Sequence, residues 1–90
     1  MDAERYTGLD RKLIQSRGDD GLVHPGHRDG TEQALRTRRL RKLARLGLAE
    51  EVRPGWWKLD ENLEPTLRRM GEKGDIIRTM QRQLTAHALA

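Results

Sequence analysis

A chain of 90 residues can bury only one small core, and this core must be largely aliphatic because the chain has no Phe, two Trp and one Tyr. A buried enzyme pocket is hard to fit into such a chain, and the absence of Cys excludes a disulfide framework and a thiolate nucleophile. No apolar run approaches the ~18 residues that a membrane span needs, and the N-terminal sequence is acidic and polar, unlike a signal peptide. We therefore expect a cytoplasmic protein with no membrane association.

The formal net charge of +4 is modest, but it is concentrated in one segment. Residues 31–49 contain six Lys or Arg against one acid, whereas residues 1–30 contain five against six and residues 50–90 contain seven against seven. Such a concentration is the electrostatic signature of a surface that binds polyanions.

The N-terminal third predicts one helix and one very short strand. Thr7 and Asp10 have the spacing of a capping box, and apolar residues follow at helical spacing, which predicts a helix over residues 8–17 that ends at Gly18. The turn-rich sequence beyond it holds one apolar pair, Leu22-Val23, which predicts a very short strand or an extended connector.

The basic segment predicts an amphipathic helix. Asp29 or Thr31 can cap this helix, which runs to Leu46, and Gly47 is placed to end it. At 100° per residue the leucines form one stripe that should face the core. The stripe consists of Leu35, Leu40, Leu43 and Leu46.

The cations of this helix divide between two sides. The exposed face carries Arg38, Arg41, Lys42 and Arg45. Arg36 and Arg39 fall at the edge of or within the apolar stripe, so we expect their head groups to extend past it into solvent. No acid one turn away compensates the exposed cations, and the planar guanidinium fork suits phosphates, so we expect an anionic partner on this face. The alternatives are an ordinary solvated face or ion pairs with Glu50, Glu51 and other acids of the same fold.

The sequence after Gly47 predicts a β-hairpin. Alternation favours strands at about residues 48–53 and 56–60, joined by a Pro54-Gly55 turn in which Gly can adopt positive φ. The apolar side of the hairpin should pack onto Leu40, Leu43 and Leu46 of the basic helix. This side consists of Val52, Trp57 and Leu59.

Trp56 should lie on the opposite side of the hairpin from Trp57. There it would stand beside Arg53 and Lys58, where an aromatic ring between cations can stack on a base or sugar. The alternative is that Trp56 packs over the last helix or against a partner chain.

The C-terminal third predicts two helices. Asn62 can cap the first, which tolerates Pro65 in its first turn and should end at Gly71. Gly74-Asp75 opens the second, a helix of about residues 75–88. One face of this last helix carries Ile76, Ile77, Met80 and Leu84.

The order helix, short strand, helix, hairpin and trailing helices is that of a winged helix-turn-helix domain in abbreviated form. We predict a single α+β domain over residues 1–90, winged-helix-like and mostly helical, with the hairpin as its wing and helices at its C-terminal end. The segment between Val23 and the basic helix is too short for a separate second helix, unless the basic segment breaks near Arg36-Thr37.

Three pieces of sequence, in this order and spacing, resemble a known family: RLRKLARLGLAEEV, PGWWKLD and GDIIRTM. With YTGLDRKL upstream, the likeness spans about residues 6–84. The family is the domain of unknown function that follows the nuclease domain in Vir-type relaxase and mobilization proteins of conjugative plasmids and integrative elements. The pair Trp56-Trp57 departs from the family pattern, which has a single aromatic at 57 after a small or basic residue.

This resemblance implies an excised module of a larger protein that nicks transfer DNA and travels with it through a type IV secretion system into a recipient cell. Nucleases of this kind use a tyrosine nucleophile and a metal held by clustered histidines. Tyr6 has no histidine cluster near it, so the nicking chemistry would lie elsewhere.

No catalytic, metal or cofactor site can be assembled from the sequence. His24 and His27 lie three residues apart in a Gly/Pro-rich turn with Asp29 nearby, which is only part of a coordination shell. We therefore expect a non-enzymatic domain that binds duplex or single-stranded DNA as a monomer. The alternative function is a protein-interaction module that helps the type IV secretion machinery to recognise the relaxase as cargo. The predicted DNA-binding residues are Arg36, Arg38, Arg39, Arg41, Lys42, Arg45, Arg53, Trp56 and Lys58.

Overall fold

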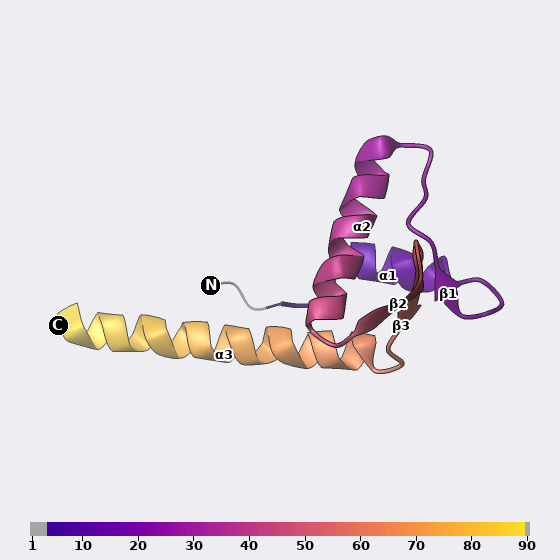
Figure 1. Cartoon of the computed structure of the whole chain (residues 1–90). Coiled ribbons are helices and arrows are strands. Elements are labelled where there is room, and N and C mark those ends of the chain that lie inside the picture. The colour runs from indigo at the N-terminus through magenta and orange to yellow at the C-terminus, as the bar shows by residue number, and fades with distance from the viewer. Residues whose placement is uncertain (1–3, 90) are drawn as a thin grey trace. The chain divides into compact units, whose positions relative to one another are not determined.

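The computed structural model describes residues 4–89, and their side chains as far as Leu84. Over this range the chain is a small α+β protein with three helices and a three-stranded antiparallel sheet (Figure 1). It divides into two compact units, one formed by residues 7–63 and one to which residues 4–6 and 64–89 belong. The elements in chain order are α1 (Gly8–Gln15), β1 (Leu22–Val23), α2 (Gly30–Arg45), β2 (Ala49–Arg53), β3 (Trp56–Leu59) and α3 (Leu63–Leu89).

The capping box predicted at the start of α1 is confirmed. The Asp10 backbone N–H donates to the Thr7 hydroxyl at 3.3 Å, and the Thr7 backbone N–H donates to the Asp10 carboxylate at 2.9 Å. These two bonds satisfy N–H groups that a helix start otherwise leaves without partners. The helix ends at Gln15 with Ser16 as its C-cap, slightly earlier than expected.

The sheet confirms both the hairpin and the very short strand. Its order is β1-β3-β2, so β3 is the central strand and pairs with both neighbours in antiparallel fashion. Val23 lies opposite Trp57. Gly55 has φ of 80°, the positive value that the predicted turn requires of its third residue.

The core of the first unit is aliphatic apart from Trp57, as the composition predicts. Its buried apolar residues are Leu13, Val23, Leu40, Leu43, Leu48, Trp57, Leu59 and Leu63. Trp57 is only 5% exposed whereas Trp56 is 38% exposed, which confirms their assignment to opposite sides of β3.

Only part of the predicted leucine stripe of α2 is buried in the core. Leu35 and Leu46, expected inside, are exposed, and the buried leucines of α2 both lie in its C-terminal half. Val52, also expected inside, is exposed as well. The register of β2 against β3 shifts between Glu51 and Arg53, and a shift of this kind interrupts the simple alternation of faces at Val52.

The prediction of two C-terminal helices is wrong, because α3 is one helix of 27 residues that continues through Gly71. Gly71 is buried, and a Cβ atom at this position would lie 2.9 Å from Cβ and 3.6 Å from Cα of Arg5. Within this unit Gly71 thus allows residues 4–5 to approach the helix closely. This close approach explains why a glycine occurs at a position where the helix does not end. Across residues 4–89, no helix combines the length and the apolar character that crossing a membrane requires.

Candidate nucleic-acid interface

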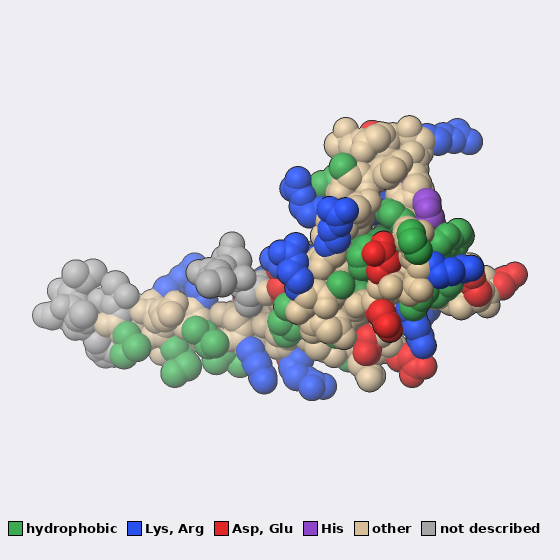
Figure 2. Space-filling model, viewed as in Figure 1, with side chains coloured by type: hydrophobic (Ala, Val, Ile, Leu, Met, Phe, Trp, Pro, Cys, Tyr) green, Lys and Arg blue, Asp and Glu red, His purple; other side chains and the backbone are tan. Residues whose placement is uncertain are grey.

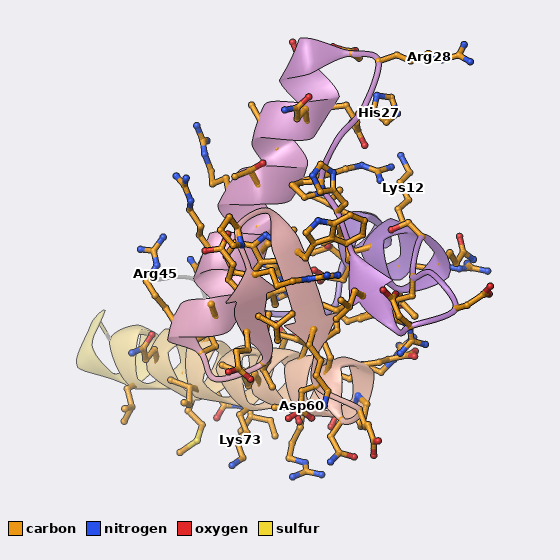
Figure 3. All side chains as sticks on the ribbon, turned by 45° about the vertical axis from the view of Figure 1, so that its right-hand side comes forward. Lys12, His27, Arg28, Arg45, Asp60 and Lys73 are labelled. Atoms are coloured by element: carbon orange, nitrogen blue, oxygen red, sulfur yellow. The ribbon has the colours of Figure 1, made fainter. Side chains whose placement is uncertain are left out.

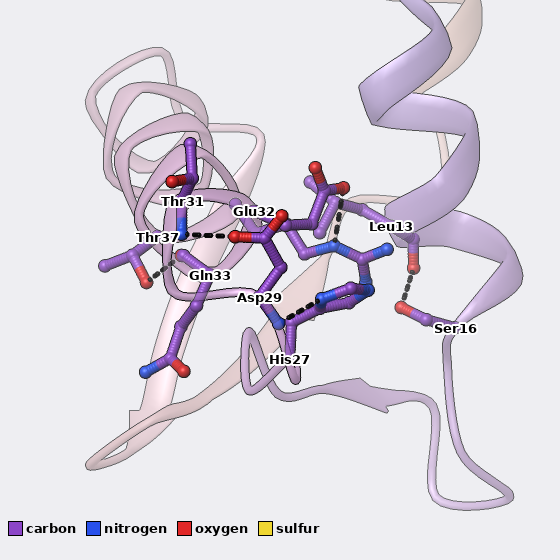
Figure 4. Close-up of polar contacts among 9 residues, drawn as sticks. Leu13, Ser16, His27, Asp29, Thr31, Glu32, Gln33 and Thr37 are labelled. Carbon is purple, nitrogen blue, oxygen red and sulfur yellow. Dashed lines mark hydrogen bonds and ion pairs between the residues drawn. The ribbon is translucent and has the colours of Figure 1, made fainter.

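The basic segment folds as one uninterrupted helix, so no break occurs near Arg36-Thr37. Asp29 is its N-cap, and its carboxylate accepts a hydrogen bond of 2.8 Å from the Thr31 backbone N–H (Figure 4). At the other end Gly47 has φ of 77°, the left-handed conformation that ends many helices at little cost when the residue is glycine. Both predicted ends are therefore confirmed.

Three of the predicted DNA-binding residues share one side of α2. Arg38, Arg41 and Arg45 are exposed, and none of their side chains forms a hydrogen bond or ion pair with another residue in the described part of the chain. We call these three residues the arginine face. Figure 2 shows Lys and Arg side chains gathered along one side of α2, and Figure 3 shows Arg45 pointing away from the helix.

The arginine face borders an open, shallow surface along α2. Besides the three arginines, this surface is lined by Gly30, Gln33, Ala34 and Thr37. Among the described residues that line this surface none is acidic, so its positive charge is not compensated there. Lys42 is exposed on α2 but does not line this surface.

Arg39 does not extend into solvent as expected. Its guanidinium donates two hydrogen bonds to the fully buried carboxylate of Asp10, from Nε at 2.6 Å and from an Nη atom at 2.8 Å. The same carboxylate accepts hydrogen bonds of 2.9 Å from the backbone N–H and the hydroxyl of Thr7. Arg39 thus compensates a buried charge.

Arg36 also lies against the protein, with 14% of its side chain exposed. Its Nε donates to the Glu32 carboxylate at 3.2 Å, one turn earlier on α2. Ion pairs within the fold were the alternative to phosphate binding, and this alternative holds for Arg36 and Arg39, whose partners are neither Glu50 nor Glu51 but other acids of the fold.

Trp56 has one expected neighbour, Arg53, and one that was not expected, His24. The Arg53 guanidinium carbon lies 5.5 Å from the centre of the Trp56 ring, and the His24 ring lies 5.0 Å from it at 55°. The antiparallel pairing of β1 with β3 could have indicated His24, because the residue after Val23 must lie near the residue before Trp57. Trp56 is therefore already packed by two side chains of its own unit.

Lys58 lies among acids. It is paired across the hairpin with Glu50, and both residues border a shallow depression together with Asp60. Trp57 and Leu59 are buried in the core with the leucines of α2, so Lys58 lies on the opposite face of the sheet. The structure therefore does not join Lys58 to the arginine face.

The side chains of His24 and His27 accept hydrogen bonds from nearby backbone N–H groups. The Nδ1 atom of His24 accepts a hydrogen bond of 3.1 Å from the Gly26 N–H, and that of His27 accepts one of 3.1 Å from the Asp29 N–H (Figure 4). Within the described residues, no three or more His, Cys, Asp or Glu side chains are grouped in a way that could hold a metal ion.

Comparison with known proteins returns one family. A family model described as a protein of unknown function (DUF3363) matches residues 36–90, a range that includes the arginine face, the hairpin and α3. No curated protein and no solved structure matches the chain significantly.

Proposed function

We propose that this chain, which belongs to the DUF3363 family of proteins of unknown function, is a non-enzymatic DNA-binding domain that uses the arginine face of α2. The observation that carries this proposal is that Arg38, Arg41 and Arg45 are exposed on one side of α2 and have no acidic partner among the residues that the structure describes.

Phosphate binding gives these three charges a physical reason to share a face. Arg38 and Arg41 are three residues apart and Arg41 and Arg45 are four apart, so each pair repels across one helical turn. A phosphate backbone replaces this repulsion by attraction and accepts the paired N–H donors of each guanidinium. Arg36 and Arg39 have no part in this contact, because their side chains stabilise the fold.

The arrangement around α2 supports a winged-helix-like reading. The basic helix is followed directly by the β2–β3 hairpin, and β1 pairs with the far side of that hairpin, in the order β1-β3-β2. In this proposal the hairpin is the wing, and Arg53 with Trp56 near its turn makes a second, weaker contact with DNA. Lys58, which lies beside Glu50 and Asp60, contributes little.

The resemblance to the domain that follows the nuclease in Vir-type relaxases supports a setting for this activity. In this setting the domain binds transfer DNA in the bacterial cytoplasm beside a nuclease domain that nicks it. Such a relaxase would then be exported with its DNA by a type IV secretion system.

A titration over salt concentration tests the proposal. Affinity for a labelled duplex should fall with a log–log slope near −3, because each neutralised phosphate contributes about −0.9. The double variant Arg41→Ala/Arg45→Ala should bind more weakly and lose about two units of this slope. The matched control is Arg11→Ala/Arg17→Ala, which removes the same charge from exposed positions outside the arginine face and should bind as the wild type does. Equal weakening in both double variants would show that only net charge matters and would overturn the proposed site.

One observation favours the second candidate function, a protein-interaction module for the secretion machinery. The side chains of Ile76, Ile77, Met80 and Leu84 on α3 are all more than half exposed. Large apolar side chains gathered in this way often mark a surface that binds another protein. No measurable binding to any oligonucleotide at about 50 mM salt would favour this function over DNA binding.

A further inference from the structure

The arginine face continues toward the start of α2 as an uncharged surface that includes an unpaired polar side chain. Gln33 lines the same shallow surface as Arg38, Arg41 and Arg45. Gln33 is exposed, and its side-chain amide forms no hydrogen bond with another described residue. The hydrogen bond of 2.9 Å from the Thr37 hydroxyl goes to the backbone carbonyl of Gln33 and not to its side chain (Figure 4). The Gln33 amide, which lies on the same surface as the arginine face, is therefore available to a bound molecule. Because an amide both donates and accepts, its hydrogen bonds can distinguish one bound molecule from another.

This end of α2 projects from the core of its unit. Thr31, Gln33, Ala34 and Leu35 are all exposed although they point in different directions around the helix, whereas Leu40 further along is fully buried. A helix with its side chains is about 10–12 Å across, and the major groove of B-DNA is about 12 Å wide. A projecting helix end can therefore enter the groove, whereas a cationic face flush with the surface reaches only the outside of the duplex.

The acidic side chains near the start of α2 repel an approaching DNA phosphate only weakly, because both have partners within the chain. The Asp29 carboxylate caps the helix through Thr31, and the Glu32 carboxylate is paired with Arg36 on another side of α2. The side chains next to Gln33 on the shared surface are small, with hydrogen at Gly30 and a methyl group at Ala34. The backbone of the helix can therefore come close to base edges.

We propose that the first two turns of α2 enter the major groove of duplex DNA and that Gln33 is a specificity-determining residue that binds an adenine base. This inference rests on the DNA binding proposed above. The amide group of Gln can donate to N7 and accept from N6 of adenine at once. The arginine face begins about one and a half turns beyond Gln33 and ends about three turns beyond it, and it then holds the phosphates beside the groove. This division of roles is the one that helices docked end-first in the groove adopt.

Selection of bound duplexes from a random pool, followed by sequencing, tests the role of Gln33. The wild-type chain should enrich a short sequence with at least one invariant A·T pair. Gln33→Ala should lose the preference at that pair and bind the selected duplex about 5- to 150-fold more weakly, with unchanged affinity for random duplex. If Gln33→Ala keeps the wild-type preference, or loses affinity for all duplexes equally, Gln33 is not a base-reading residue.

Two tryptophan substitutions test groove entry. Ala34→Trp places a bulky ring on the surface shared with the arginines, and Leu35→Trp places the same ring at a neighbouring exposed position that does not line this surface. Ala34→Trp should weaken duplex binding at least about tenfold and leave binding to single-stranded DNA unchanged, whereas Leu35→Trp should bind both as the wild type does. Circular dichroism establishes that both variants are folded. Equal duplex affinity of the two variants would overturn groove entry.

The results separate this inference from the proposed function. A wild-type chain that binds duplex DNA with the expected salt dependence but enriches no sequence would overturn the inference alone. A chain that binds no DNA would overturn both, and protein binding would then be the remaining function.

Discussion

Asp10 and Arg39 join α1 to α2 through two parallel hydrogen bonds, of 2.6 and 2.8 Å, and the carboxylate is fully buried. The pair is 29 residues apart in the sequence, and the Thr7 cap holds the same carboxylate from the other side. The contact therefore ties the start of α1 to the middle of α2, which also carries the arginine face.

The first prediction concerns this pair. Arg39→Met should lower the free energy of unfolding by about 3–5 kcal/mol, because it leaves the Asp10 carboxylate buried without its countercharge. Asp10→Leu/Arg39→Met should be more stable than Arg39→Met, since no isolated charge remains, although it loses the cap of α1, which is worth about 1 kcal/mol. Urea unfolding followed by circular dichroism measures both. If Arg39→Met is as stable as the wild type but binds DNA more weakly, Arg39 belongs to the interface and not to the fold.

The second prediction separates the two tryptophans. Trp57→Ala should cost about 3–5 kcal/mol, as large aromatic deletions in cores do. Trp56→Ala should cost much less, because the ring is partly exposed and its contacts are with His24 and Arg53 at the surface. Thermal melts followed by circular dichroism decide the matter, and equal destabilisation would contradict the observed faces of β3.

These residues show which parts of the structure could be predicted from the sequence. The cap of α1, both ends of α2 and the hairpin depend on residues a few positions apart, so their patterns are visible in the chain. The bond between Asp10 and Arg39 is not, because nothing local indicates which acid meets which base across 29 residues. Helical spacing therefore separated Arg36 and Arg39 from the exposed cations, but the sequence could not show that these two arginines are paired with acids of the fold.

The third prediction tests that sorting through stability. Arg41→Ala/Arg45→Ala should change the free energy of unfolding by no more than about 0.5 kcal/mol, and at low salt should raise it slightly, because it removes like charges one turn apart and adds good helix formers. The comparison is with Arg39→Met, which should be strongly destabilised. Urea titrations at two salt concentrations measure the effect. Marked destabilisation of the Arg41→Ala/Arg45→Ala variant would mean that these side chains have a structural role.

The fourth prediction concerns Gly71 and Arg5, which meet within the second unit. In a free helix Ala is better than Gly by about 1 kcal/mol, but here the added methyl carbon would lie 2.9 Å from Cβ of Arg5, an atom too close to the backbone to move aside. Gly71→Ala should therefore stabilise the wild-type chain little or destabilise it, and should displace residues 4–6. That displacement would break the 2.9 Å ion pair of Arg5 with Asp75 and the contact of Tyr6 with Arg68, whose guanidinium carbon lies 4.8 Å from the ring centre.

A double-mutant cycle with Arg5→Gly isolates the steric conflict. Arg5→Gly removes the Cβ atom that a methyl group added at position 71 would strike, so in this background Gly71→Ala should stabilise the chain by up to about 1 kcal/mol through helix propensity alone. The loss of the ion pair with Asp75 affects both Arg5→Gly chains equally and cancels. Thermal melts give the stabilities, and the chemical shifts of the Tyr6 ring report whether residues 4–6 remain on the helix. The same effect of Gly71→Ala in both backgrounds would show that Arg5 and Gly71 are not in contact in solution, and glycine at position 71 would then need another explanation.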